Sequence, residues 1–547
     1  MLLVAGIWLA SNLTKPLTVD DAAYYAFARH VAAHPADPYG FSIYWYQEPQ
    51  PAIDVLAPPV WLYWWAAGIR VFGDHEWAWK LWQFPLIWLF VAAVTSLARR
   101  FVREPVARLL PAFVVLSPIF LPGLNLMLDV PALALGLAAF ALFTRASDRE
   151  SVGGAVVAGL VAGLAMQTKY TGLLVPAAML LYAALLGRTR LALAAAGVAA
   201  AVFASWETAM LWCYGQSQFL ASLTEPGGGL GGTWSLVPSL VTLAGGVGSA
   251  WGFLGLAALG TRRRAIGAAM LASFAGFVAL GWLPARTLVL LPDAMAAILG
   301  RPGIHLNPAL DLYRLLGIFV LVVMVSTLVR LRRDADRTDW FLIGWLALEI
   351  TGYLLLNPFV AVRRVMGLGV VATLTIGRLA NRTHASAGLR HAARAVVCYN
   401  AALAILFAVT DRADAVAQRD GAARAAAAAH ALLPEPEARP WYVGHWGFQF
   451  YAERAGMEAV VPGTSRLREG HLLVVPGSPV DAQRIDVPPS SIKEMTQLDL
   501  DDGLPWRTVP IYYRGAVPLS VRPTGPRLRV TVYRVTADFV PDAWRAR

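Results

Sequence analysis

Long apolar runs, separated by short polar connections, recur along the first 410 residues of the chain. A membrane-spanning helix needs about 20 mostly apolar residues. Runs close to this length predict thirteen spans, with approximate boundaries at 1–13, 77–98, 107–123, 126–144, 152–168, 171–187, 191–213, 237–259, 265–283, 312–330, 340–357, 364–380 and 392–410. The pattern therefore predicts an all-α polytopic membrane domain over residues 1–411.

Two regions depart from the repeat of spans. Residues 14–76 form a long first loop rich in Trp, Tyr and Pro, and its segment 58–73 is apolar but too short and aromatic to span, which predicts an interfacial helix. Residues 412–547 are more polar and predict a small α/β domain. We expect an Ala-rich helix to about 433, strands at 440–444, 471–476, 508–513 and 528–536, and a helix at 446–456.

Composition agrees with a membrane protein. The chain has 57% apolar and 15% charged residues, against about 45–50% and about 25% in ordinary soluble domains. These values disfavour a disordered, fibrous or nucleic-acid-binding protein. Only Cys213 and Cys398 are present, both in apolar segments, which disfavours a disulfide framework or a thiolate metal site.

Arginine predicts the orientation of the spans, because basic residues gather in cytoplasmic connections. Alternate connections carry Arg99, Arg100, Arg103, Arg108, Arg145, Arg149, Arg188, Arg190, Arg262, Arg263, Arg264, Arg330, Arg332, Arg333, Arg337, Arg378, Arg382, Arg390 and Arg394. The intervening connections carry only Lys15, Arg29, Arg70, Lys169, Arg286, Arg301, Arg363 and Arg364. We therefore expect a cytoplasmic N-terminus and an extracytoplasmic domain over 412–547. The Ala- and Arg-rich, Lys-poor composition is typical of a GC-rich bacterial genome, which indicates a bacterial inner membrane.

Acidic side chains occur at two membrane-boundary positions on the predicted outer side. Asp20 and Asp21 follow the first span, where one carboxylate could act as a general base or both could start a helix. Asp129 lies near the outer end of an otherwise uncharged hairpin. A carboxylate in a span is costly and is a functional candidate, although Asp129 could also cap the helix that follows.

Basic side chains occur at two further outer positions. Lys169 is one of four lysines and lies between two apolar spans; it could bind a phosphate or anchor the helix at the interface. Arg363 and Arg364 break the positive-inside pattern and suggest an anionic ligand. A phosphate-binding loop and a dinucleotide fingerprint are both missing, and His30 and His34 alone do not make a zinc site.

In order along the chain, these passages resemble the GT-C membrane glycosyltransferases, in particular the family-39-like branch of protein O-mannosyltransferases and lipid A aminoarabinose transferases. The passages are DDAAYYAFARHV (20–31), PPVWLYWWAAGIRVFG (58–73), LNLMLDVPALAL (124–135), MQTKYTGLLVPAAML (166–180) and, more weakly, VRRVM (362–366). YVGHWGFQFYAERAG (442–456) is similar to outer C-terminal domains of such proteins. Two positions depart from the family pattern: Ala57 stands where many members have Lys or His, and Arg364 replaces an aromatic residue.

The resemblance implies a polyprenyl-phosphate-linked sugar donor, a lipid, glycan or protein acceptor, and direct displacement with inversion. It implies that Asp20 acts as the base, that Asp21 and Asp129 orient the acceptor or stabilise positive charge, and that Lys169 with Arg363 or Arg364 binds the donor phosphate. Tyr24, Tyr25 and His30 are expected to line the acceptor site. No metal is required, although a carboxylate-bound divalent ion remains compatible with the arrangement. A polytopic transporter or lipid flippase and a non-catalytic envelope assembly protein remain alternatives at this point.

Overall fold

The chain is described here by a computed structural model. The described residues are 1–45, 48–224, 236–280, 288–291, 304–357, 359–382, 387–433, 439–477, 485–508, 515, 517, 519–521 and 525–543.

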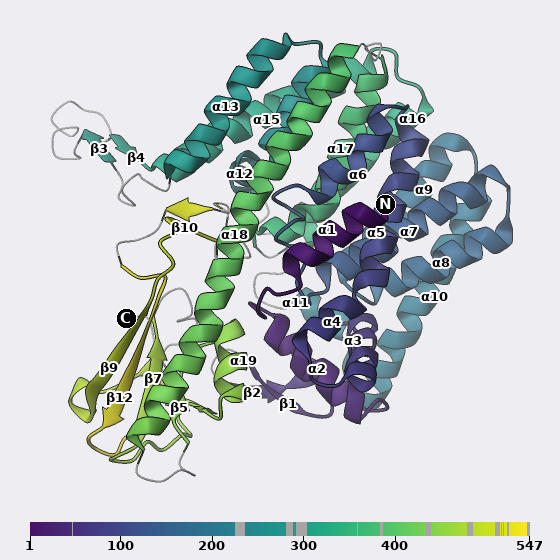
Figure 1. Cartoon of the computed structure of the whole chain (residues 1–547). Coiled ribbons are helices and arrows are strands. Elements are labelled where there is room, and N and C mark those ends of the chain that lie inside the picture. The colour runs from purple at the N-terminus through teal and green to yellow at the C-terminus, as the bar shows by residue number, and fades with distance from the viewer. Residues whose placement is uncertain are drawn as a thin grey trace.

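Helices dominate the structure, and each of the thirteen predicted segments corresponds to one (Figure 1). Eight stretches in the described part of the chain are long and apolar enough to cross a membrane, and four shorter apolar helices accompany them. The predicted polytopic fold is therefore confirmed. The helices are α1 (Leu2–Asn12), α5 (Phe84–Phe101), α6 (Val106–Val115), α7 (Asp129–Asp148), α8 (Val152–Met166), α9 (Leu174–Leu186), α10 (Thr189–Tyr214), α12 (Leu236–Ala258), α13 (Arg263–Leu280), α15 (Pro308–Arg332), α16 (Arg337–Leu356), α17 (Met366–Arg382) and α18 (Ala387–Leu432).

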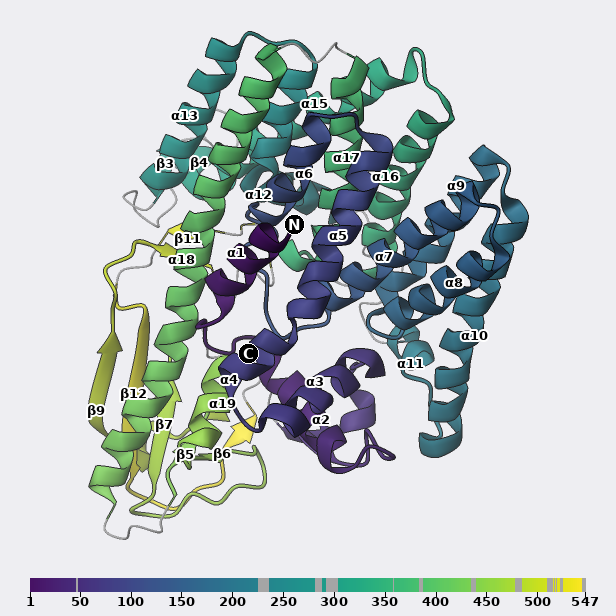
Figure 2. The same cartoon turned by 45° about the vertical axis from the view of Figure 1, so that its right-hand side comes forward.

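Small residues allow the closest helix contact, between α12 and α15. A Cβ atom on Gly245 would lie 1.8 Å from the Tyr313 carbonyl oxygen, and one on Gly317 would lie 1.9 Å from the Val241 oxygen. Such close approach is typical of helices that pack within a membrane, where dispersion contacts replace the hydrophobic driving force. The helices α8, α9 and α10 lie along the opposite side of the bundle from α18 (Figure 2).

Ion pairs join the arginine-rich connections to one another. Arg100 Nη1 lies 2.6 Å from Asp148 Oδ2, and Arg188 Nη2 lies 2.7 Å from Glu150 Oε1. Arg378 of α17 pairs with Asp339 near the start of α16, at 2.8 Å. Arg378 Nη1 also donates to the Phe101 carbonyl at the end of α5, at 3.4 Å. Together these contacts place the ends of α5, α7, α9 and α17 on the same side of the bundle, as alternating connections require. That this side is cytoplasmic stays a prediction.

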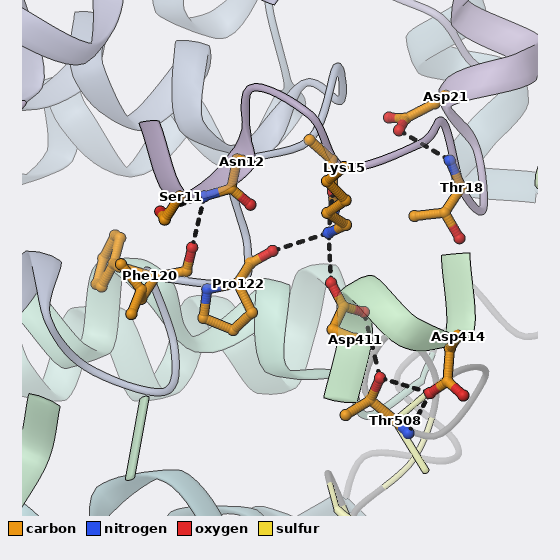
Figure 3. Close-up of polar contacts among 12 residues, drawn as sticks. Ser11, Asn12, Lys15, Thr18, Asp21, Phe120, Pro122, Asp411, Asp414 and Thr508 are labelled. Carbon is orange, nitrogen blue, oxygen red and sulfur yellow. Dashed lines mark hydrogen bonds and ion pairs between the residues drawn. The ribbon is translucent and has the colours of Figure 1, made fainter. Parts of the chain in front are cut away.

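A buried, non-helical segment separates α6 from α7, so the prediction of helix at 116–123 and 126–128 is wrong. Pro118, Pro122 and Gly123 interrupt the apolar run and stop the helix after Val115. Backbone carbonyls inside a membrane protein must find donors. Side chains of α1 and α3 supply two of them, Trp8 Nε1 to Phe120 O at 2.7 Å and Trp61 Nε1 to Leu126 O at 2.8 Å. Lys15, in the loop after α1, supplies a third, from Nζ to Pro122 O at 3.0 Å (Figure 3).

The first loop folds into a compact cap below the bundle (Figures 1 and 2). Its elements are α2 (Asp21–Ala33), β1 (Ser42–Trp45), β2 (Glu48–Pro51), η1 (Ala52–Asp54), α3 (Pro59–Phe72) and α4 (Glu76–Trp82). The helix predicted at 58–73 is confirmed as α3. Pro59 occupies its first turn, where the missing N–H is not needed.

The C-terminal residues form the predicted small α/β domain around one five-stranded sheet. The strand order is β6 (Glu458–Ala459), β5 (Trp441–Tyr442), β7 (Leu472–Pro476), β12 (Leu528–Val535) and β9 (Ile492–Leu500), with α19 (Trp446–Arg454) following β5. The sheet packs against α18, which runs without a break through residue 411. The predicted strand at 508–513 falls largely on residues outside the described ones. The prediction missed β9, because its sequence IKEMTQLDL is largely polar and exposed.

Candidate active site

Charged side chains from four distant segments meet at the loop side of the bundle. Asp20 precedes α2, Asp129 begins α7, Lys169 precedes η2 (Tyr170–Leu173), and Arg363 lies in η4 (Val362–Val365). Arg363 Nη1 lies 2.7 Å from Asp20 Oδ2, and Lys169 Nζ pairs with Asp129 Oδ1. The structure therefore joins the sequence-predicted acidic and basic residues as two ion pairs.

Arg364 gives this cluster one more cation than carboxylates. Its Nη1 donates to Asn357 Oδ1 at 2.7 Å, and its guanidinium lies 4.0 Å from the centre of the Phe359 ring. Asp20 and Asp129 supply two negative charges, against three positive charges from Lys169 and the two arginines. Because the side chains of the ion pairs are mostly buried, water screens this surplus weakly. The cluster therefore favours an added anion.

A narrow cavity of about 80 Å³ lies directly against this cluster. Asp129, Lys169, Arg363 and Arg364 line its polar part. The rest of the wall is mainly apolar and comes from α7, α9, α16 and the start of α17: Ala132, Leu133, Gly136, Leu137, Phe140, Leu174, Val175, Ala178, Trp345, Met366 and Leu368. A site that is charged at one end and mainly apolar along the rest, with polar groups of α16 in its wall, matches a lipid with a charged headgroup.

Two buried donors at the cavity lack a partner among the described residues, namely the Tyr353 hydroxyl and Arg364 Nε. An unsatisfied buried polar group costs about 1–3 kcal/mol, so such groups are uncommon unless a ligand completes them. Both residues line the cavity. Their free hydrogen-bonding capacity suits a ligand that carries oxygen acceptors.

The turn that carries Lys169 is held by its neighbours. A Cβ atom on Gly172 would lie 2.6 Å from the carbonyl carbon of Ala165, so only glycine fits there. The Tyr170 hydroxyl donates to Glu207 Oε1 at 3.1 Å. Glu207 also accepts from Ser217 Oγ at 2.7 Å. The glycine and the buried carboxylate together fix the direction of the lysine side chain.

Asp21 lies apart from this cluster, although it neighbours Asp20 in sequence. Its Oδ2 accepts from the Thr18 backbone N–H at 3.1 Å, its side chain is 1% exposed, and Oδ1 has no partner among the described residues (Figure 3). Burial raises the pKa of the Asp21 carboxyl to about 7, against the lowering effects of the Thr18 N–H and of the Lys15 and Lys80 charges. Neither Asp20 nor Asp21 lines the cavity described above, but Asp20 is joined to it through its ion pair with Arg363.

The predicted acceptor-lining residues divide between two places. Tyr24 lies beside the charged cluster, where burial and then the Asp20 charge raise the pKa of its phenol far above the usual range. The Tyr25 hydroxyl donates to Asp74 at 2.7 Å, and the His30 ring stacks on Phe41 at 4.3 Å. Tyr25 and His30 line a second cavity, of about 440 Å³. The described residues include no group of three His, Cys, Asp or Glu side chains placed to hold a metal ion.

Sequence reasoning missed the contribution of α16 to the site. Glu349, Tyr353 and Asn357 all line the first cavity. Glu349 Oε1 accepts from Trp345 Nε1 at 3.2 Å. A single carboxylate within an otherwise apolar span is a functional candidate by itself, and this signal in the segment 340–357 could have identified Glu349.

Comparisons with known proteins agree with the resemblance seen in the sequence. Residues 57–212 match the family model described as dolichyl-phosphate-mannose-protein mannosyltransferase. No curated protein sequence gives a significant match. The match covers α3, Asp129 and Lys169, and confirms the resemblance to GT-C glycosyltransferases over that stretch. Together with the multi-span fold, it supports a membrane glycosyltransferase.

Several solved structures are similar to the chain at low sequence identity. ArnT from Cupriavidus metallidurans in the apo state is 15% identical, with 87% of this chain and 91% of that chain covered and a TM-score of 0.41. The same protein bound to undecaprenyl phosphate is 15% identical, with 98% of this chain and 97% of that chain covered and a TM-score of 0.42. A third structure is that of the oligosaccharyltransferase AglB from Archaeoglobus fulgidus in complex with an inhibitory peptide and a dolichol-phosphate. It is 13% identical, with 84% of this chain and 63% of that chain covered and a TM-score of 0.49.

Proposed function

We propose that the protein transfers a sugar from a polyprenyl-phosphate donor to an acceptor hydroxyl at the outer face of a bacterial inner membrane. The observation that carries the proposal is the cavity whose cation-rich end continues into an apolar wall between α7, α9 and α16. The cations suit a phosphate, and the apolar wall suits the first part of a prenyl chain. The matching family model is described by dolichyl-phosphate-mannose, a sugar donor of this chemical class.

Three cations stabilise the departing phosphate in this proposal. As the bond between the anomeric carbon and the phosphate oxygen breaks, negative charge grows on the phosphate. Lys169, Arg363 and Arg364 lie at the polar end of the cavity, where fixed donors in a water-poor site are worth most. A lipid phosphate is already a weak base, so it needs these charges more than it needs a general acid.

Asp20 accepts the proton of the attacking hydroxyl. The acceptor oxygen forms a bond to the anomeric carbon, the polyprenyl phosphate leaves with the bonding electron pair, and the hydroxyl proton passes to the Asp20 carboxylate. A single displacement inverts the anomeric centre. Arg363 contacts Asp20 and also lines the cavity, so it couples the base to the phosphate site.

The other two aspartates position this machinery. Asp129 fixes the Lys169 ammonium in the cavity. Asp21 is buried beside the turn that holds Asp20, and we assign it to holding that turn rather than to contact with the donor. Tyr24 lies near Asp20, Arg363 and Asp129, and we assign it to contact with the transferred sugar or the acceptor. The acceptor in this proposal is a lipid, glycan or protein that carries a free hydroxyl group.

The test compares donor binding with sugar transfer in the full-length protein. Membranes that contain Asp20→Asn should lose the glycosylated product, as measured by mass spectrometry of envelope glycans and lipids, while the purified variant in nanodiscs still binds undecaprenyl phosphate. Arg364→Gln should weaken undecaprenyl phosphate binding about 10- to 100-fold, as expected for the loss of a charge-assisted contact. The exposed residues Asp486 and Arg439 provide matched controls, Asp486→Asn and Arg439→Gln.

Two results would overturn the proposal. Normal product with Asp20→Asn at normal protein level would remove Asp20 from the reaction. Absence of undecaprenyl phosphate binding by the natural protein would remove the donor assignment itself.

A further inference from the structure

The second cavity lies between the first loop and the C-terminal domain. Its volume is about 440 Å³, and its walls come from α2, β1 and α19. The helices α2 and α19 lie side by side below the membrane bundle in both views (Figures 1 and 2). Two segments more than 400 residues apart in the chain therefore form one cavity.

The wall from α19 is a row of linked polar side chains. His445, Gln449 and Glu453 recur every four residues and so share one helix face. His445 Nδ1 lies 3.0 Å from Gln449 Oε1, and Gln449 Nε2 donates to Glu453 Oε1 at 3.1 Å. The ring of Trp45 from β1 meets the His445 ring edge to face at 5.3 Å. All four residues line the cavity.

The other side of α19 docks tightly on the segment that leads to Asp20. A Cβ atom on Gly447 would lie 2.4 Å from the Leu17 carbonyl oxygen, so glycine is required for this approach. The Leu17 backbone N–H donates to the Tyr451 hydroxyl at 2.9 Å, and that hydroxyl donates to Glu76 at 2.8 Å. The position of α19 is therefore fixed relative to the proposed base.

Backbone strain occurs on both sides of this cavity. Val19, which lines the cavity and directly precedes Asp20, has φ +51°. Trp446, which directly follows His445, has φ +61°. Positive φ is uncommon for non-glycine residues and is costly for a β-branched one, and such strain concentrates at binding and catalytic sites. The third such residue in the described part of the chain, Glu150, lies in the turn between α7 and α8.

We infer that this second cavity binds the carbohydrate portion of the acceptor, and that α19 makes the C-terminal domain part of the active site. The inference rests on the proposed function, because it places the acceptor on the side of Asp20 away from the phosphate cavity. Amide, imidazole and carboxylate groups that alternate with aromatic rings match a ligand with many hydroxyl groups and apolar C–H faces. The second cavity also carries the charged or ionisable side chains of Arg29, His30 and His34 beside its apolar residues, whereas the wall of the first cavity is mainly apolar away from its charged end.

Substitutions on the open face of α19 test this inference. Gln449→Leu removes an amide group from the cavity, and Glu453→Gln replaces a carboxylate acceptor with a neutral amide, in both cases without changing Gly447 or Tyr451. We expect each variant to lower the amount of glycosylated product about 10-fold or more, because a hydroxyl group of the ligand that loses its hydrogen-bonding partner in the site binds much more weakly. Affinity of the purified variants for undecaprenyl phosphate should stay within about twofold of the natural protein. Gln497→Leu, at an exposed position of β9, is the matched control.

A binding measurement separates the inference from the proposed function. The full-length protein in nanodiscs is titrated by calorimetry with di- and trisaccharides of mannose, galactose, arabinose and rhamnose. Binding of at least one saccharide that Gln449→Leu abolishes supports the cavity assignment, even if undecaprenyl phosphate does not bind and the donor proposal fails. Normal product from both α19 variants, or equal loss of undecaprenyl phosphate binding in both, would overturn the inference and leave the donor proposal to its own test.

Discussion

Replacement of Lys169 by methionine tests the ion pair at the centre of the site. Methionine keeps the length of the side chain and removes its charge. The Asp129 carboxylate, whose side chain is only 7% exposed, then loses its cation. Removal of one member of a buried pair costs about 3–5 kcal/mol. Because 21% of the Lys169 side chain is exposed, we expect the lower end of this range, about 3 kcal/mol, or about 150-fold in the unfolding equilibrium.

A second substitution separates stability from chemistry. Lys169→Met with Asp129→Asn removes both charges, so most of the lost stability should return. Transfer should not return, because the loss of one preorganised donor to a developing anion lowers rates about 100- to 1,000-fold. Thermal unfolding in nanodiscs, followed by tryptophan fluorescence, reports the first effect, and mass spectrometry of the glycosylated product reports the second. Lys493→Met, at an exposed position of β9, is the control.

Two outcomes would refute this reasoning. If Lys169→Met unfolds at the temperature of the natural protein, the pair with Asp129 does not contribute as the geometry implies. If the double variant forms normal amounts of product, Lys169 does not stabilise the leaving phosphate.

Three further predictions follow from the geometry. Burial raises the pKa of Asp21 to about 7, above its unfolded value near 4, so the folded state holds the extra proton between these values and stability should fall as pH rises from about 4 to about 7. Asp21→Asn should flatten this decline. An equal decline of the unfolding temperature with pH in the two proteins would contradict the prediction. Gly172→Ala places a Cβ atom 2.6 Å from the Ala165 backbone and should lower both the unfolding temperature and transfer. Gly153→Ala in α8, with no atom within 4 Å of the new Cβ, should lower neither. Tyr353→Phe removes a buried hydroxyl that has no partner among the described residues. The variant should unfold at the same temperature or higher, while its affinity for undecaprenyl phosphate falls about 10-fold. A lower unfolding temperature would show that the hydroxyl stabilises the fold instead.

The sequence predicted most of the fold because the bilayer imposes a length and an apolar character on each spanning segment. The segments later seen as α7, α10, α12 and α16 were all identified in this way. The irregular segment at 116–128 was not, because its side chains are as apolar as those of a helix. Only Pro118, Pro122 and Gly123 distinguish it, and its carbonyl groups depend on donors from α1, the loop after it and α3, which no local pattern shows.

The charged residues of the site could be selected from sequence because charge at a membrane boundary is costly. Which carboxylate pairs with which cation could not be predicted from the sequence. Asp20 contacts Arg363 and Asp129 contacts Lys169. The sequence instead suggested that Asp20 and Asp21 act together, because they are adjacent in the chain. At the start of α2, the Asp21 side chain points toward the Thr18 backbone while Asp20 pairs with Arg363. The two neighbours in sequence therefore lie in different environments. The helix at 446–456 could be predicted from its sequence, but the position of its faces could not, since that position depends on close contact between Gly447 and Leu17.

The unbroken course of α18 limits how the two halves of the molecule can move. A helix of 46 residues is about 70 Å long, more than twice the hydrocarbon thickness of a bilayer. Because the same rod enters the bundle at one end and carries the sheet at the other, a swinging motion of the C-terminal domain would require α18 itself to bend. The walls of the second cavity, which come from α2, β1 and α19, therefore stay together as long as α18 stays straight.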